Sequence, residues 1–256
     1  MLHYIDHAKM GHSHRDWLDS QFHFSFAEYF KPDNIRFGIL RVVNDDIVQP
    51  GAGFTTHPHR DMEILSYVVS GKLSHKDNLG NAHTLGRGQA QYMSAGTGVT
   101  HSEYNWGSEN LRFLQIWLFP DKSGYRPDYG DFPFAWEDRV EKWLPLATGY
   151  DNEDNGAPIK LHADAHIYTA FFPEDGSIEL KVGRDRQAYM ILLEGEADVE
   201  GLHINTRDAV EVLRQDVTIN AKAGAHILVV EMAYDGKAYR AKFEKGSTLR
   251  NWTGVA

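Results

Sequence analysis

Residues 63–73 read EILSYVVSGKL, an apolar run rich in β-branched and aromatic side chains that ends at Ser70-Gly71. Such a run is typical of a strand, and the glycine indicates a tight turn, so we expect a β-hairpin here. Further along the chain, residues 188–197 read AYMILLEGEA and repeat the pattern with Gly195 at the turn. The repetition predicts two related β units, each a barrel or a sandwich.

Other apolar runs have the same character and are separated by Gly, Asn and Asp: residues 36–43, 111–119, 188–193 and 227–232. Long helical patterns do not occur, although residues 16–30 and 133–144 could each hold a short helix. The polar stretch 148–156, TGYDNEDNG, has the composition of a loop. We therefore expect an all-β protein with a few short helices, divided into domains of residues 1–145 and 146–256.

The composition excludes several classes of site. The 256 residues include no cysteine, so disulfides, thiolate metal sites and a cysteine nucleophile are ruled out. The formal net charge of −10 disfavours direct binding to nucleic acid, because that affinity depends on Lys and Arg. The N-terminal residues lack the pattern of a signal peptide, and no apolar run is long enough to span a membrane. We expect a cytoplasmic protein.

Two doublets carry the candidate chemistry, His57-Pro58-His59 and His101-Ser102-Glu103. In each doublet the two side chains are separated by one residue, so on a strand they point to the same face. Pro58 cannot donate to a sheet ladder and favours an extended conformation of His57. Two glycines, Gly96 and Gly98, precede the second doublet and allow a bend or bulge that redirects its side chains.

Histidine pairs of this kind also arise by chance. With 14 His in 256 residues, a His-x-His pair is expected about once. We interpret His12-Ser13-His14 as a solvated pair, and His162 and His166 are four residues apart, a spacing that aligns on a helix rather than on a strand. On the residues alone, the two doublets either share a metal ion or are ordinary histidines satisfied by backbone hydrogen bonds.

Imidazoles and one carboxylate, without thiolate, suit Fe(II), Mn, Co, Ni, Cu or Zn. Four protein ligands leave one or two positions open on a five- or six-coordinate ion. Open positions are typical of catalytic rather than structural metal sites.

The spacing Gly51-(x5)-His57-x-His59-(x3)-Glu63 resembles the first cupin motif, although its closing glycine, Gly71, falls one residue late. Residues 88–105 resemble the second motif, with Ser94 where proline is usual and two extra residues before His101. Residues 57–63 and 91–103 are similar to pirin, and residues 16–26 and 43–46 to bacterial pirin-like proteins.

The resemblance implies a bicupin, in which two antiparallel β-barrels (double-stranded β-helices) lie face to face and the first holds a metal. Carried over by position, it implies the ligands His57, His59, His101 and Glu103. Glu63 occupies the usual cupin carboxylate position, and we assign it a supporting role, such as fixing a ligand imidazole. The scattered histidines of the second half, with no doublet among them, predict a metal-free barrel.

The resemblance also implies a quercetin 2,3-dioxygenase, in which Glu103 takes the 3-hydroxyl proton of a flavonol before O2 opens the ring with loss of carbon monoxide. Fe(II) is the expected metal, with Ni, Co, Mn, Cu or Zn as alternatives. A flat polyphenol needs apolar and aromatic walls, and the strands near the ligands offer these candidates: Phe54, Met62, Tyr92, Met93, Gln115 and Trp117. For each of them ordinary core packing is the alternative.

A competing class is a binding module. Eukaryotic pirins resemble redox-sensitive transcriptional co-regulators, which would imply a protein partner whose affinity follows the oxidation state of the metal. A third possibility is a dioxygenase or isomerase that acts on another small enol or hydroxy-ketone. Turnover with release of carbon monoxide separates the first class from the second.

Overall fold

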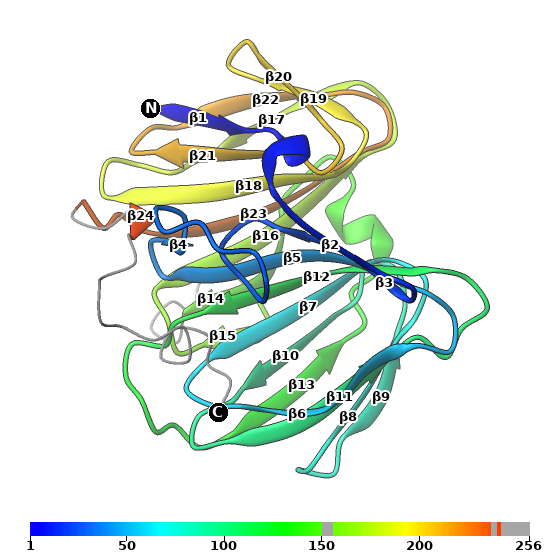
Figure 1. Cartoon of the computed structure of the whole chain (residues 1–256). Helices are drawn as coiled ribbons and strands as arrows, with labels where there is room; N and C mark the ends of the chain where they lie inside the picture. Colours follow the sequence, from blue (N-terminus) through cyan, green and yellow to red (C-terminus); the bar gives the residue numbers. More distant parts are fainter. Residues whose placement is uncertain (150–155, 237–239, 242–256) are drawn as a thin grey trace. The chain divides into compact units, whose positions relative to one another are not determined.

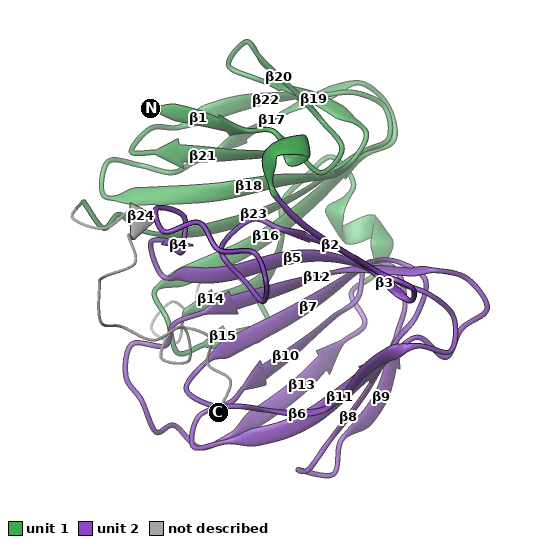
Figure 2. Ribbon diagram, in the orientation of Figure 1, with its two compact units in different colours: residues 1–10, 135–239 green, residues 11–134, 240–256 purple. Residues whose placement is uncertain are grey.

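The computed structural model describes residues 1–149, 156–236 and 240–241 of the chain (Figure 1). The chain divides into two compact units (Figure 2). Unit 1 comprises Met1–Met10 and Ala135–Tyr239, and unit 2 comprises Gly11–Phe134 and Arg240–Ala256. The boundary between the units thus lies between residues 134 and 135, and the first ten residues belong with the second half of the chain. Most of the polar stretch that suggested a boundary, residues 150–155, lies outside the described residues.

Unit 2 consists of two sheets. The larger is ordered β13 (Asp128–Phe132), β10 (Ala90–Ser94), β7 (Glu63–Ser70), β12 (Leu111–Leu118), β5 (Leu40–Val48), β3 (Leu18–Phe22) and β2 (Gly11–Arg15), with β4 (Arg36–Phe37) and β24 (Arg240–Ala241) off this path. The smaller is ordered β6 (Gly53–His59), β11 (Val99–Tyr104), β8 (Leu73–Asp77) and β9 (Ala82–Leu85). The unit is therefore a two-layer sandwich rather than a closed barrel.

Unit 1 is also built from two sheets. The larger is ordered β1 (Leu2–Ile5), β21 (Ala209–Leu213), β18 (Arg186–Glu194), β23 (Ala225–Ala233), β16 (Ala165–Phe172), β14 (Leu144–Gly149) and β15 (Ile159–Leu161). The smaller is ordered β17 (Gly176–Leu180), β22 (Val217–Ala221), β19 (Glu196–Val199) and β20 (Leu202–Asn205). Strands β14 and β15 run parallel, and the other strand pairs within the described residues are antiparallel.

The two units repeat one topology. The order β10-β7-β12-β5 in unit 2 matches β21-β18-β23-β16 in unit 1, and β6-β11-β8-β9 matches β17-β22-β19-β20. Each match advances the strand number by eleven. The expectation of an all-β chain with two related units is confirmed, and the predicted strands at residues 63–69 and 111–119 correspond to β7 and β12.

The two predicted hairpins are wrong in the same way. Gly71 follows β7 with φ +79°, but β7 lies in the larger sheet and the next strand, β8, lies in the smaller one. Gly195 has φ +81° and connects β18 to β19 across the sheets of unit 1. The glycines do make tight turns, and these turns carry the chain from one layer to the other.

Helices are few and short. Residues 16–30, all of which are described, form β3 and turns instead of the expected helix. Residues 133–144 contain a single 3₁₀ turn, Trp136–Arg139, and a second one spans His7–Lys9. Buried positions alternate along β3, as in a strand with one buried face, but the middle one is the polar Ser20, so the sequence shows no apolar alternation there.

Within the described residues, no helix is both long and apolar enough to cross a bilayer.

Candidate metal centre

The two histidine doublets lie on neighbouring antiparallel strands of unit 2, β6 and β11. His101 is paired in register with His57, and Val99 with His59. A β-bulge lies between His101 and Glu103, so that Glu103 is paired with Phe54. The extra residue in β6 keeps His57 and Phe54 on one face despite their odd spacing. Both doublets therefore point into the space between the two sheets.

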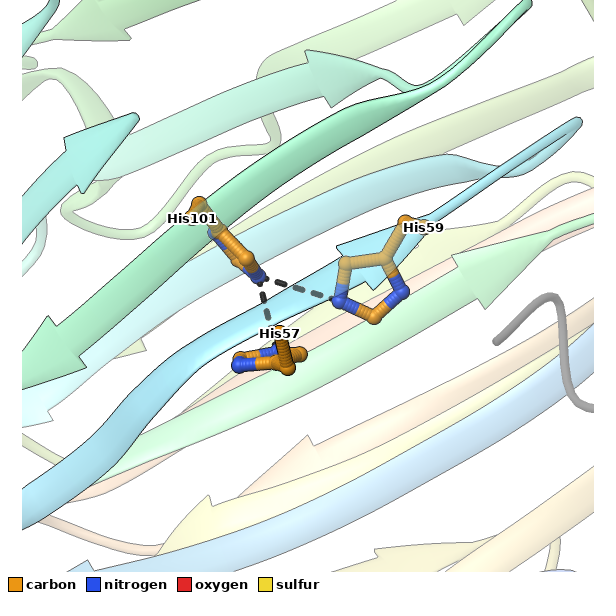
Figure 3. A group of neighbouring side chains, drawn as sticks. All are labelled: His57, His59 and His101. Carbon is orange, nitrogen blue, oxygen red and sulfur yellow. Dashed lines mark hydrogen bonds between the residues drawn. The ribbon is translucent and has the colours of Figure 1, made fainter. Parts of the chain in front are cut away.

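Three imidazoles converge there (Figure 3). The His101 Nε2 atom lies 3.0 Å from His59 Nε2 and 3.0 Å from His57 Nε2. His59 and His101 are buried and His57 is partly exposed. Two nitrogens bound at about 2.1 Å to adjacent positions of one ion would lie about 3.0 Å apart, so the spacing fits a shared metal.

The hydrogen bond of His57 determines which of its nitrogens is free. Its Nδ1 lies 2.7 Å from the carbonyl oxygen of Thr55. A carbonyl only accepts, so Nδ1 carries the proton and Nε2 of the neutral ring presents a bare lone pair to His101.

A relay of two hydrogen bonds, from His101 to His75 and from His75 to Asp77, determines which ring nitrogen of His101 carries the proton. The Nε2–H of His75 donates to Asp77 Oδ2 at 3.2 Å, which leaves His75 Nδ1 as an acceptor. His101 Nδ1 lies 3.4 Å from that atom and donates to it. The Nε2 atom of neutral His101 is therefore bare as well. Two lone pairs facing each other at 3.0 Å repel, and a cation between them removes the repulsion.

The surroundings keep these rings neutral. Burial lowers the pKa of His59 to about 3, and the neighbouring His57 adds to the effect. Burial also lowers the pKa of His101, His57 and His75 below the ordinary histidine value. The Asp77 carboxyl is buried too, but hydrogen bonds from Asn81 and other donors outweigh burial and keep its pKa low. Neutral imidazole is the form that binds a metal ion.

Glu103 is held by donors from three strands of the opposite sheet. Its Oε1 accepts from Ser66 Oγ at 3.0 Å and from Gln91 Nε2 at 2.6 Å, and its Oε2 accepts from Gln115 Nε2. Burial raises the pKa of Glu103 to about 7, against the effect of these hydrogen bonds and with a contribution from Asp46. The carboxylate is thus fixed in position without a neighbouring cationic side chain among these partners.

Strand register explains why these donors meet. Gln115 on β12 is paired with Ser66 on β7 and with Asn44 on β5, and Ser66 is paired with Gln91 on β10. Four polar residues therefore form one row across the larger sheet, on the face that looks toward β11. These four residues are Asn44, Gln115, Ser66 and Gln91.

Two overlapping groups of side chains could hold a metal within unit 2: His57, His59 and His101, and also His75, His101 and Glu103. Both contain His101. The tautomers above leave Nε2 of His101 free to bind a metal ion, while its Nδ1 donates to His75. A metal ion is therefore favoured on the side of His101 that faces His57 and His59.

A cavity of about 170 Å³ adjoins the imidazoles. It is lined by Phe26, Asn44, Asp46, Phe54, His57, His59, Glu103, Gln115 and Trp117. Of the predicted pocket residues, Phe54, Gln115 and Trp117 lie on its wall. Met62 and Met93 are instead packed in a buried cluster with Ile64 and Val99.

Glu63 and Tyr92 form a separate contact. The Tyr92 hydroxyl donates to Glu63 Oε2 at 2.5 Å, and Ser94 Oγ donates to Oε1 at 2.6 Å. These bonds tie β7 to β10, and neither partner is a histidine of the cluster. A role of Glu63 in fixing a ligand imidazole therefore stays a prediction.

Other histidines lie elsewhere. His12 and His14 are exposed on β2, and each lies within hydrogen-bond distance of Asp19. In unit 1, Asp6, His7 and Asp208 form a further group that could hold a cation. Asp208, however, already accepts from the backbone and ring of His7, from Tyr4 and from the Asn205 amide.

Sequence reasoning missed several residues of the site. His75-Lys76-Asp77 is a doublet of the kind that singled out the others, with both side chains on one face of β8. Asn44 and Asp46 share that spacing on β5, where polar side chains interrupt an apolar run. Buried polar residues inside apolar strands were the signal available for them.

The sequence matches the family described as Pirin over residues 5–118 and the family described as Quercetinase C-terminal cupin domain over residues 150–232. A pirin-like protein of Caulobacter vibrioides is 39% identical, covering 88% of this chain and 97% of the relative. A quercetin 2,3-dioxygenase of Escherichia coli K12 is 37% identical, covering 87% and 94%. The bacterial pirin of Escherichia coli, solved in complex with nickel(II), has 34% identity and a TM-score of 0.84, covering 92% of this chain and 100% of that chain.

Proposed function

The chain belongs to the pirin family and contains two copies of the cupin fold, and from that premise we propose that it is a metal-dependent dioxygenase that cleaves a flavonol such as quercetin with O2 and releases carbon monoxide. The observation that carries the proposal is the convergence of three imidazole Nε2 atoms beside an open cavity with aromatic walls, which the buried carboxylate of Glu103 also lines.

In this proposal His57, His59, His101 and Glu103 hold one divalent transition metal ion. The donor set is three neutral imidazoles and a carboxylate, which suits Fe(II), the metal expected from the sequence, and equally the nickel(II) of the Escherichia coli relative. A bound ion would supply Lewis acidity toward a substrate oxygen and would leave room for a ligand on the cavity side.

The cavity wall suits a flat aromatic ligand. Phe26 packs edge-on against Trp117, with ring centroids 5.6 Å apart, and Trp117 packs edge-on against His59 at 4.8 Å. Phe54 contributes a second aromatic face, packed edge-on against Phe113. Rings in such fixed arrangements form a slot for a planar molecule, and they exclude water from the reacting groups.

Glu103 is the candidate general base. Its carboxylate lines the cavity, where it can receive the 3-hydroxyl proton of a flavonol bound next to the histidines. Ser66, Gln91 and Gln115 keep the two oxygens in place while the proton moves. The ionised flavonol then reacts with O2, both oxygen atoms enter the ring-opened ester, and carbon 3 leaves as carbon monoxide.

Oxygen uptake and carbon monoxide release by the metal-loaded protein with quercetin test this function directly. We expect both in equal amounts. Glu103→Gln should lower kcat at least about 100-fold, because general-base catalysis contributes that much. Glu211→Gln is the matched control, since Glu211 is equally buried but lies in unit 1, outside the metal centre. We expect this control to keep turnover within a few-fold.

Two results would contradict the proposal. A metal-loaded protein that consumes no oxygen with quercetin would leave the alternative of a redox-sensitive regulatory protein with a protein partner. Full turnover by Glu103→Gln with its metal retained would show that the carboxylate is not the base.

A further inference from the structure

The cavity wall on β5 and β12 carries hydrogen-bonding atoms that nothing in the described chain pairs. Gln115 donates through Nε2 to Glu103, which fixes the amide and leaves Oε1 as an acceptor. Among the described residues, no donor reaches this Oε1 or the Oδ1 of Asn44. Both residues line the cavity, and both side chains are more than nine-tenths buried.

An unpaired buried acceptor is unfavourable, and native proteins keep few of them. Here two occur on residues that face each other in register on neighbouring strands, at the edge of one cavity. Their shared position indicates that a bound molecule, rather than the protein, supplies the missing donors.

The charge of the wall narrows the chemistry of that molecule. Asp46 lies two residues from Asn44 on the same face of β5 and adds a buried carboxylate. None of the nine described residues that line the cavity is Lys or Arg. Within the described chain, the wall thus offers two unpaired acceptors and an unpaired donor, Trp117 Nε1, beside a carboxylate that repels anions. It suits neutral hydroxyl groups, which both donate and accept, and disfavours carboxylate or sulfate substituents.

We propose that Asn44 Oδ1 and Gln115 Oε1 form a subsite that accepts hydrogen bonds from ligand hydroxyls beyond the metal-binding one, and that the site selects polyhydroxylated aromatic compounds. This inference rests on the proposed function, because the flavonol is placed by the metal. A ligand without such hydroxyls would bury the two acceptors unpaired and bind more weakly.

Anaerobic titration of the metal-loaded protein tests the subsite without turnover. Three probes share the coordinating 3-hydroxyl: quercetin, 3-hydroxyflavone, which has no other hydroxyl, and quercetin methylated on its other four hydroxyls. We expect quercetin to bind at least about tenfold more tightly than either of the others. The methylated compound keeps the oxygens, loses the donors and adds four methyl groups, whereas 3-hydroxyflavone lacks the donors without added bulk. Weaker binding of both probes therefore indicates hydrogen bonding rather than substituent size.

Asn44→Leu then assigns the effect to the wall. Leucine keeps the branched shape of asparagine, is somewhat larger and has no acceptor, so we expect the quercetin preference to fall to within about twofold to threefold. Metal content should stay as in the unmodified protein, and affinity for 3-hydroxyflavone should not fall, because this ligand no longer buries the unpaired Asn44 Oδ1. If the variant fails to fold, the three-probe series on the unmodified protein still decides the question.

The results distinguish failure of the subsite from failure of the proposed function. Equal affinity for the three probes, or an unchanged preference in Asn44→Leu, overturns the subsite even if quercetin is cleaved in air. A clear preference that Asn44→Leu removes, without cleavage in air, supports the subsite and removes the dioxygenase assignment. Binding of none of the probes overturns the subsite.

Discussion

His101 is engaged through both of its ring nitrogens. Nε2 faces His57 and His59, while Nδ1 donates to His75, which in turn donates to Asp77. A donor relay that ends on a carboxylate raises the basicity of a metal-binding imidazole and fixes its orientation. Tyr129 covers the other face of the relay, stacked on His75 at 4.5 Å.

Replacing His75 should therefore weaken metal binding indirectly, through the loss of its hydrogen bond with His101. We expect His75→Phe to raise the Kd for the metal about tenfold, because a phenyl ring keeps the stacking on Tyr129 and loses the acceptor for His101. His83→Phe is the control, since His83 also stacks on Tyr129, at 6.1 Å, but is exposed. Titration calorimetry with the apo-protein measures both. Equal Kd values for the two variants would show that the relay has no influence on the metal.

At the scale of single residues, the sequence pointed to His57, His59 and His101, which lie close together, and missed most of the residues that orient the site. The spacing of one residue placed His57 with His59 and His101 with Glu103, because side chains alternate along a strand. The donors to Glu103 could not be found in that way, since Ser66, Gln91 and Gln115 come from three strands whose register is a tertiary property.

Among the elements, the turns that connect the two layers of each unit depend on glycine. Gly71 has φ +79°, and a Cβ there would lie 2.7 Å from the Asn110 carbonyl oxygen. Gly195 has φ +81°, and its Cβ would lie 2.8 Å from Cα of Ala225. In both units, therefore, the chain passes from the larger to the smaller sheet at a glycine, where any side chain would clash with backbone atoms.

Gly71→Ala should destabilise the protein more than a substitution with the same backbone strain alone. We expect a loss of about 2 to 4 kcal/mol, combining the positive φ with the clash against Asn110. Gly124→Ala is matched, with φ +83° and nothing within 4 Å of its Cβ, and should lose about 1 kcal/mol. Urea unfolding of the two variants gives the difference, and equal losses would show that the close approach is not limiting.

The same turns mark what sequence patterns could not decide. A glycine after an apolar run predicts a reversal of the chain, and both reversals are present. Whether the next strand pairs with the previous one or joins the opposite sheet depends on where β12 and β23 insert. These strands are distant in sequence, and β12 occupies the place beside β7 that a hairpin partner would take.

In the whole molecule, one topology supports two different interiors. The strands of unit 1 that match β6 and β11 are β17, GSIEL, and β22, VTINA, and neither contains histidine. Their inward side chains, among them Val217 and Ile219, belong to an apolar cluster that also includes Met190 and Val229. The prediction that the second cupin holds no metal is consistent with that filling and stays a prediction.

The N-terminal residues join a strand of the second half of the chain within unit 1. Strand β1 pairs with β21, and Tyr4 and His7 both bond to Asp208. Nothing in the first ten residues indicated a partner two hundred residues away, because an edge strand has no local signature of its neighbour. The expected boundary at residue 145 could not show that the first ten residues belong with the second half of the chain.

Deletion of residues 2–10 should therefore affect unit 1 and leave the metal centre in place. We expect faster amide hydrogen exchange in β21 and a lower Tm, because β21 loses its pairing with β1 and Asp208 loses bonds from Tyr4 and His7. Metal content should match the full chain, since the candidate ligands all lie in unit 2. Loss of the metal together with unchanged exchange in β21 would contradict this division.

Anomalous diffraction from crystals grown with one equivalent of Fe(II) or Ni(II) tests the central claim most directly. The account predicts a single peak in unit 2, within about 2.3 Å of the Nε2 atoms of His57, His59 and His101 and of one Glu103 oxygen. A peak on the Nδ1 side of His101, next to His75, or a metal bound only outside unit 2, would contradict it.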